Sequence, residues 1–131
     1  MKLVYPVCFY AEGDGSYSVA VPDLPGCFTQ GDNLAEAIEM AIDAASGWVL
    51  TELEDGNKPP KASMAEDIQL EYENGFVNLV VLDMDSYAEK YGDKAVRKNL
   101  TIPAWLNTRA ESENINFSAI LQDALQEKLL G

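Results

Sequence analysis

The fold is decided by the stretch at residues 3–21, which reads LVYPVCFYAEGDGSYSVAV. Apolar side chains alternate along residues 3–10, and this period of two predicts a β-strand. Residues 12–15, Glu-Gly-Asp-Gly, predict a tight turn, because glycine readily adopts the positive φ that such turns need. The alternation resumes at residues 16–21, so the stretch predicts two antiparallel strands joined by a hairpin.

The residues after the hairpin predict a third strand, a long helix and a fourth strand. Pro22 and Pro25 end the second strand, since proline cannot donate a hydrogen bond to a neighbouring strand, and residues 27–30 fit a short third one. Apolar residues recur every three or four positions over residues 34–53, which predicts a helix packed on the sheet. Residues 76–82 are apolar on both faces and therefore predict a central strand.

The ends of the long helix carry their own signals. Asn33, followed three residues later by Glu36, predicts a capping box at its start. Residues 55–60, Asp-Gly-Asn-Lys-Pro-Pro, predict its end. Residues 83–94 predict a polar connection with room for one helical turn. We therefore expect an α+β protein whose residues 1–92 form a β-β-β-α-β domain.

A different pattern begins after this connection. Polar and apolar side chains alternate at residues 97–102, which predicts a short strand. Pro103 has the φ of a first helical position and predicts a helix near residues 104–112. Asn116 is a natural N-cap for a last helix. That helix is expected to bury one apolar side, formed by Phe117, Ile120, Leu121, Ala124, Leu125 and Leu129.

Residues 95–131 are expected to be a separate segment that pairs with a second chain. Domains below ~40 residues usually need metals, disulfides or a partner chain to bury a core. Pairing of two copies through the predicted strand would meet this need and create a two-stranded ribbon. The polar face of such a ribbon can enter the major groove of DNA.

The composition excludes several classes of function. The chain has no histidine and two cysteines, Cys8 and Cys27. This removes histidine-activated nucleophiles and most zinc sites, and favours buried thiols in a reducing compartment. The N-terminus does not resemble a signal peptide, and the longest apolar stretch, residues 76–82, is far shorter than the ~20 residues of a membrane span. We expect a soluble, cytoplasmic protein with no membrane partner, no catalytic residue, no metal ligand and no cofactor.

The net charge of −13 is unevenly distributed. Residues 1–95 carry 18 acidic and 5 basic residues, whereas residues 96–131 carry 4 of each. An acidic surface repels nucleic acid and favours a basic protein partner. If the chain binds DNA, the neutral C-terminal segment is therefore the part expected to bind it.

The C-terminal segment resembles ribbon-helix-helix repressors in residues 97–103, Arg-Lys-Asn-Leu-Thr-Ile-Pro, followed by Leu106 and residues 116–121. The resemblance implies DNA-binding roles for Arg97, Asn99, Thr101, Asn116 and Ser118. It implies dimerisation through Leu100, Ile102, Ile120 and Leu121. Arginine and asparagine can bond base edges with two hydrogen bonds each, and a helix N-terminus suits a phosphate. Lys98 departs from the pattern, which expects an apolar residue there, and the polar alternation also fits the solvated face of an ordinary hairpin.

The N-terminal part resembles the HicB antitoxin domain, a partial ribonuclease-H-like fold. The resemblance is strong over residues 3–53 and looser over residues 76–91. It is carried by Tyr5-Pro6-Val7, Gly15-Ser16-Tyr17, Pro22-Asp23-Leu24-Pro25-Gly26-Cys27, Thr29-Gln30-Gly31-Asp32 and Ala35-Glu36-Ala37. It implies an antitoxin of a type II toxin–antitoxin pair, which neutralises a small basic ribonuclease toxin and represses its own operon at operator DNA. The expected assembly is a homodimer that could pair further into a tetramer.

Two other interpretations remain open. The chain could be a solitary ribbon-helix-helix transcriptional regulator whose N-terminal domain senses a ligand or mediates oligomerisation. A metal-dependent nuclease is a weaker alternative, because a ribonuclease-H-like fold can hold Mg²⁺ on clustered carboxylates. The available aspartates lie mostly on predicted turns: Asp14, Asp23, Asp32 and Asp83.

Overall fold

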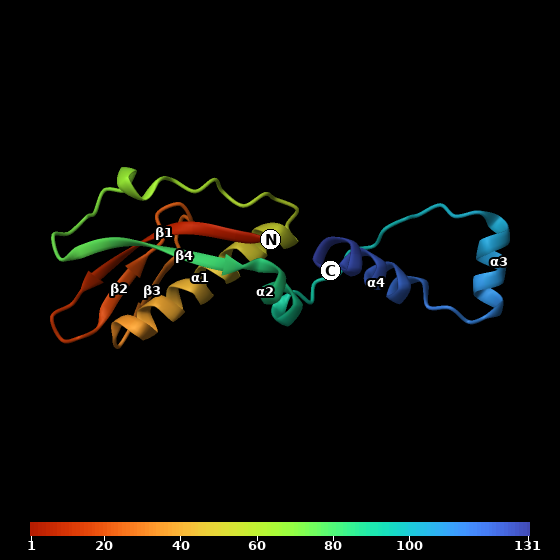
Figure 1. Ribbon diagram of the computed structural model, residues 1–131, viewed down its shortest axis with the longest axis horizontal. Helices are drawn as coiled ribbons and strands as arrows, with labels where there is room; N and C mark the ends of the chain where they lie inside the picture. Colours follow the sequence, from red (N-terminus) through yellow and green to blue (C-terminus); the bar gives the residue numbers. More distant parts are fainter. The chain divides into compact units, whose positions relative to one another are not determined.

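The computed structural model describes residues 1–131, which form two compact units (Figure 1). Unit 1 comprises Met1–Lys94 and unit 2 comprises Ala95–Gly131. Each unit is described by itself below. Unit 1 is a mixed α+β fold with an antiparallel sheet, and unit 2 contains two helices.

The sheet of unit 1 has four strands in the order β3-β2-β1-β4. Their bounds are Lys2–Ala11 for β1, Tyr17–Ala20 for β2, Phe28–Gly31 for β3 and Gly75–Asp83 for β4. All neighbouring pairs are antiparallel. The helix α1 lies between β3 and β4 in the chain, so the predicted β-β-β-α-β order is confirmed.

The prediction that residues 76–82 form a central strand is wrong, because β4 lies at the edge of the sheet and pairs only with β1. Val80 and Leu82 face α1 and are buried, whereas Leu79 and Val81 on the opposite face are 52% and 53% exposed. A strand that is apolar on both faces is typical of burial on both sides. In unit 1 only the side facing α1 receives full cover.

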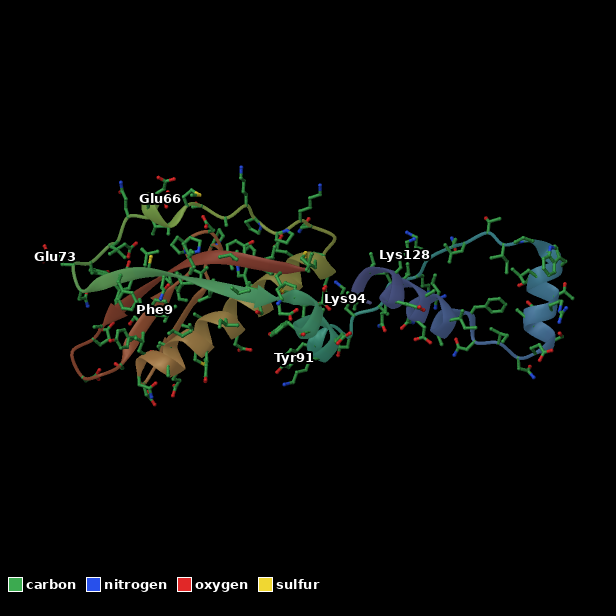
Figure 2. All side chains as sticks on the ribbon, in the orientation of Figure 1. Phe9, Glu66, Glu73, Tyr91, Lys94 and Lys128 are labelled. Atoms are coloured by element: carbon green, nitrogen blue, oxygen red, sulfur yellow. The ribbon has the colours of Figure 1, made fainter.

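Helix α1, Leu34–Glu54, covers one face of the sheet. Four of its residues are fully buried at a spacing of four: Ala37, Ala41, Ala45 and Val49. Three of them are alanines, whose small side chains allow the helix to lie close to the strands. At Gly31 the approach is closest, since a Cβ atom there would lie 2.3 Å from the backbone nitrogen of Ala37. Phe9 fills the interior beneath this helix (Figure 2).

The structure confirms the predicted cap at the start of α1, except that the Glu36 carboxylate has a different hydrogen-bond partner. The Asn33 side chain accepts a hydrogen bond from the Glu36 N–H at 2.9 Å. The Glu36 carboxylate accepts from the N–H of Asp32 at 3.3 Å, one residue before the partner expected in a capping box. Two donors at the helix start are thereby satisfied.

The other face of the sheet is crossed by residues 58–74, which we call the strap; Figure 1 shows it on the side of β1 away from α1. It contains one short 3₁₀ turn, η1, Ala65–Asp67. The Tyr10 hydroxyl accepts a hydrogen bond from the Glu71 N–H at 3.2 Å, and Tyr72 packs edge-on against the Tyr10 ring. The strap thus buries Cys8 and Tyr10 on a face for which the sequence predicted no cover.

The connection after β4 forms helix α2, Met84–Tyr91, which is longer than the single turn predicted. The Asp83 carboxylate caps it by accepting a hydrogen bond from the Ser86 N–H at 3.2 Å. The rings of Tyr87 and Tyr91 contact each other on one side of the helix, with centroids 4.6 Å apart and planes inclined by 44°. Tyr87 also lies against the core that α1 forms with the sheet.

Unit 2 contains helices α3, Ala104–Ser112, and α4, Phe117–Leu130, which begin where the sequence predicted. Residues 92–103 form neither helix nor strand, so the predicted ribbon strand at residues 97–102 is absent from the single chain. A strand requires a hydrogen-bonded neighbour, and unit 2 holds no second extended segment that could supply one.

Candidate functional site

Local capping residues mark the starts of the two helices of unit 2. The Pro103 carbonyl accepts the first helical hydrogen bond of α3 from the Asn107 N–H at 3.1 Å. The Asn116 side chain caps α4 by accepting a hydrogen bond from the Ala119 N–H at 3.0 Å. Between the helices, Asn114 adopts a φ of 54°, the left-handed conformation that asparagine tolerates better than most residues.

The predicted base-contacting residues Arg97, Asn99 and Thr101 are all exposed and lie in the irregular segment before α3. Their alternate positions would place them on one face if this segment became a strand. Asn116 and Ser118 are exposed at the start of α4, where free backbone N–H groups and the helix dipole favour an anion. The Asn116 side-chain oxygen is already used as the helix cap, which leaves its amide group as the available donor.

The predicted dimerisation residues are apolar and largely open to solvent. Leu100 is 58% exposed, Ile102 42% and Ile120 54%, and Leu121 is half-buried. The prediction that α4 buries an apolar side is therefore wrong for the single chain: Phe117, Ile120, Leu125 and Leu129 are exposed. Two helices in one chain cannot cover each other's apolar faces completely.

Part of this apolar surface forms a groove of about 420 Å³. Its lining is mostly aliphatic and aromatic: Ile102, Leu106, Ala110, Ile115, Phe117 and Ile120. Arg109 and Glu113 also line it and supply one charge of each sign. Sequence reasoning missed the contributions of Ala110 and Ile115; Ile115 stands between two turn-forming asparagines, where no helical period could identify it.

Unit 1 presents a different chemistry, because its surface is dominated by carboxylates. Three of the four aspartates considered for a metal site accept hydrogen bonds from different serines: Asp14 from Ser16, Asp23 from Ser63 and Asp83 from Ser86. No group of three or more potential metal-ligating side chains occurs in the structure. Hydrogen bonds from Ser16 hold the pKa of Asp14 below its usual value, and those from Ser86 do the same for Asp83.

The two cysteines are buried free thiols, as predicted from their number. Burial raises the pKa of both Cys8 and Cys27 above the usual thiol value. A raised pKa lowers the fraction of reactive thiolate at neutral pH, so neither cysteine has the features of a nucleophile. None of the helices combines the length and the hydropathy needed to cross a bilayer.

Comparison with known proteins identifies relatives of both units. The model of the HicB-like antitoxin family of bacterial toxin–antitoxin systems matches residues 5–124. An uncharacterised 14.9 kDa protein from the rep-hol intergenic region of Haemophilus phage HP1 is 38% identical over 111 residues, which span 83% of this chain and 80% of the phage protein. Antitoxin HicB 1 of Photorhabdus laumondii is 43% identical over 56 residues, which span 43% of this chain and 36% of that protein.

Solved structures agree with the sequence relatives. A chain of a toxin–antitoxin complex from Streptococcus pneumoniae is similar with a TM-score of 0.59 at 28% identity, covering 98% of this chain and 99% of that one. The antitoxin HicB of Burkholderia pseudomallei is similar with a TM-score of 0.57 at 26% identity, covering 97% and 96%. The resemblance to HicB antitoxins noted in the sequence is therefore confirmed, and the chain belongs to the HicB-like antitoxin family of bacterial toxin–antitoxin systems.

Proposed function

We propose that this chain is the antitoxin of a type II toxin–antitoxin pair, with the two tasks divided between its units. Unit 1 binds and neutralises a small basic ribonuclease toxin. Unit 2 pairs with a second copy as a ribbon-helix-helix and represses the operon at its operator. The observation that carries the proposal is the contrast between a strongly acidic folded unit and a neutral unit with an uncovered apolar face.

The toxin-binding part of the proposal is supported by charge. Residues 1–95 carry a net charge of −13, which attracts a cationic protein and repels nucleic acid. Complementary charge accelerates association more than it tightens the final complex. Membership of an antitoxin family supplies the class of partner, and a toxin–antitoxin complex is among the similar solved structures.

The DNA-binding part is supported by the state of residues 97–102. Leu100 and Ile102 are exposed, Ile102 lines the apolar groove of unit 2, and the segment has no strand partner within its own chain. A second copy would pair the two segments as an antiparallel ribbon and cover the apolar side. The same pairing would present Arg97, Asn99 and Thr101 on the outer face, where ribbon residues contact bases.

The proposal includes no catalytic step and no metal or cofactor, and it assigns the protein to the cytoplasm, where toxin, RNA and operator occur together. A solitary transcriptional regulator is not favoured, because the family that matches residues 5–124 is one of antitoxins. The dimer could pair further into a tetramer through other surfaces.

The test uses the full chain and the product of the adjacent reading frame, expected to be a small basic protein. That protein is assayed for RNA cleavage with increasing amounts of the full chain, and the full chain is assayed separately for binding to the upstream DNA. Loss of cleavage near equimolar antitoxin, together with DNA binding, is the expected result. DNA binding without any effect on the neighbouring protein would favour the solitary regulator instead.

A further inference from the structure

Strand β4 is a long open edge of the unit 1 sheet. It spans nine residues and pairs with β1 on one side only. Proteins usually protect edge strands with prolines, lysines, bulges or short length. β4 contains no proline and no lysine, whereas the opposite edge strand, β3, has only four residues. The exposed edge of β4 is therefore the part of this sheet best suited to pair with another strand.

The direction of the backbone groups along β4 can be assigned. At its end, the Met84 N–H donates to the Met1 carbonyl at 3.0 Å, so even-numbered residues direct their backbone groups toward β1. These directions alternate along an antiparallel strand. The Leu79 N–H accordingly points away from β1, and it donates to the side-chain oxygen of Asn78 at 2.8 Å rather than to a strand. The backbone groups of Val77 and Val81, two positions before and after Leu79, also point to the open side.

Val77, Leu79 and Val81, whose backbone groups point away from β1, also carry apolar side chains beside the open edge. Leu79 and Val81 are 52% and 53% exposed on the face away from α1, and Val77 precedes them on that face. Val4, which pairs with Val81 in register, is 46% exposed and extends the apolar strip onto β1. A strand added at this edge would lay alternate side chains against the strip.

Charge decides between a second copy and a different partner. Residues 58–90, which contain and flank β4, carry seven acidic residues and three basic ones, Lys58, Lys61 and Lys90, so this stretch is net negative. Glu66 and Glu73 in this stretch are exposed and point into solvent (Figure 2). Lys2, opposite Asp83 in register, is the one basic residue that pairs with β4. Two such edges would repel each other, whereas a strand flanked by lysine or arginine would be attracted.

We propose that the open edge of β4 is where the toxin docks, by adding an extended segment with alternate apolar side chains and flanking basic residues. Main-chain hydrogen bonds to Val77, Leu79 and Val81 would hold the segment, and the apolar strip would select its side chains, as in other cases of β-strand addition. This inference rests on the proposed binding of a basic toxin and specifies the surface that binds it.

The test compares three full-chain variants with the wild type in binding to the small basic protein of the adjacent reading frame. Leu79→Lys places a charge on the apolar strip, and Val81→Pro removes an N–H that faces outward without breaking a bond to β1. Phe28→Lys is the matched control, because it replaces an apolar residue that is 73% exposed on the other edge strand with the same charge. Circular dichroism checks that each variant is folded.

We expect the two β4 variants to weaken binding by at least about 30-fold, and the control to stay within about 3-fold of wild type. Hydrogen exchange should show the Val77, Leu79 and Val81 amides becoming protected in the complex. If the wild type binds and both β4 variants bind equally well, the toxin docks elsewhere and only this inference fails. If the wild type does not bind, the proposed function fails and this inference fails with it. Loss of self-association in the β4 variants, with toxin binding intact, would identify a second copy as the occupant instead.

Discussion

Asp23 and Ser63 join the turn after β2 to the strap: the Asp23 carboxylate accepts hydrogen bonds from the Ser63 N–H at 2.8 Å and from its hydroxyl at 2.6 Å. The same turn is held on its other sides by the buried Leu24 and by a hydrogen bond from the Trp48 indole to the Pro25 carbonyl at 3.0 Å. The Pro-Asp-Leu-Pro-Gly motif therefore fixes the strap over the sheet as well as ending a strand.

This pair predicts a measurable coupling. Asp23→Ala and Ser63→Ala should each lower the free energy of unfolding, and the double variant should lose less than the sum. The expected coupling is at most about 1 kcal/mol, because the bonds are exposed to solvent and Ser63→Ala removes only the hydroxyl bond. Urea unfolding of the four proteins measures it. Strictly additive losses would show that the two residues do not stabilise the fold through each other.

A second prediction concerns acid. Hydrogen bonds from the Ser86 backbone lower the pKa of Asp83 below its ordinary value of 3.8. A carboxyl whose pKa is lower when folded stabilises the fold above the ordinary pKa, and this contribution is lost as pH falls through the folded pKa. Asp83→Asn keeps an oxygen that can cap α2 but does not titrate. The wild type should therefore have the higher free energy of unfolding above about pH 3.8, and the difference from this variant should disappear as the pH falls further. Urea unfolding across pH measures it. A difference in the free energy of unfolding that does not change with pH would contradict the stabilising role of the ionised Asp83 carboxylate.

Local signals in the sequence predicted the helices well. The caps at Asn33 and Asn116 are short-range hydrogen bonds within one turn, so the residues that make them are neighbours in the sequence. The hairpin of β1 and β2 is similarly local. The strap was not predicted, because residues 58–74 have no periodic pattern and their contact with Tyr10 spans about sixty residues of chain.

The position of β4 and the burial of α4 could not be predicted for a related reason. Apolar residues such as Leu79 and Ile120 indicate that a surface becomes covered, but they do not indicate whether the cover comes from the same chain. In both places the single chain leaves the side chain exposed. The predicted ribbon at residues 97–102 depends in the same way on a second strand, and its DNA-contacting role stays a prediction.

The proposed dimer predicts the effect of one substitution in unit 2. Leu100→Lys would place an unpaired charge on the covered side of the ribbon and should dissociate the homodimer. Thr101→Lys is the matched control, because the neighbouring residue lies on the opposite face and should leave the dimer intact. Analytical ultracentrifugation at micromolar concentration distinguishes the two. A wild-type chain that sediments as a monomer with unit 2 fully folded would rule out the proposed pairing.

DNA binding should depend on the outer face of the ribbon. Arg97→Ala and Asn99→Ala should each cost roughly 1–3 kcal/mol of operator affinity and relax the sequence preference at one position. Affinity should also fall steeply with salt, with a log–log slope near 0.9 for each phosphate contacted. Fluorescence anisotropy with operator and scrambled duplexes measures both effects. Equal losses on the two duplexes would mean that these residues contact the backbone rather than the bases.

The division of labour between the units is tested most directly by a chain truncated after Lys94, which retains the complete core of unit 1. This chain is co-purified with the small basic protein of the adjacent reading frame and assayed for RNA cleavage and for repression of the operon. We expect it to bind that protein and inhibit cleavage while failing to repress, and added salt should slow association far more than it speeds dissociation. If the truncated chain loses the basic protein and residues 95–131 alone retain it, the assignment of the two units is reversed.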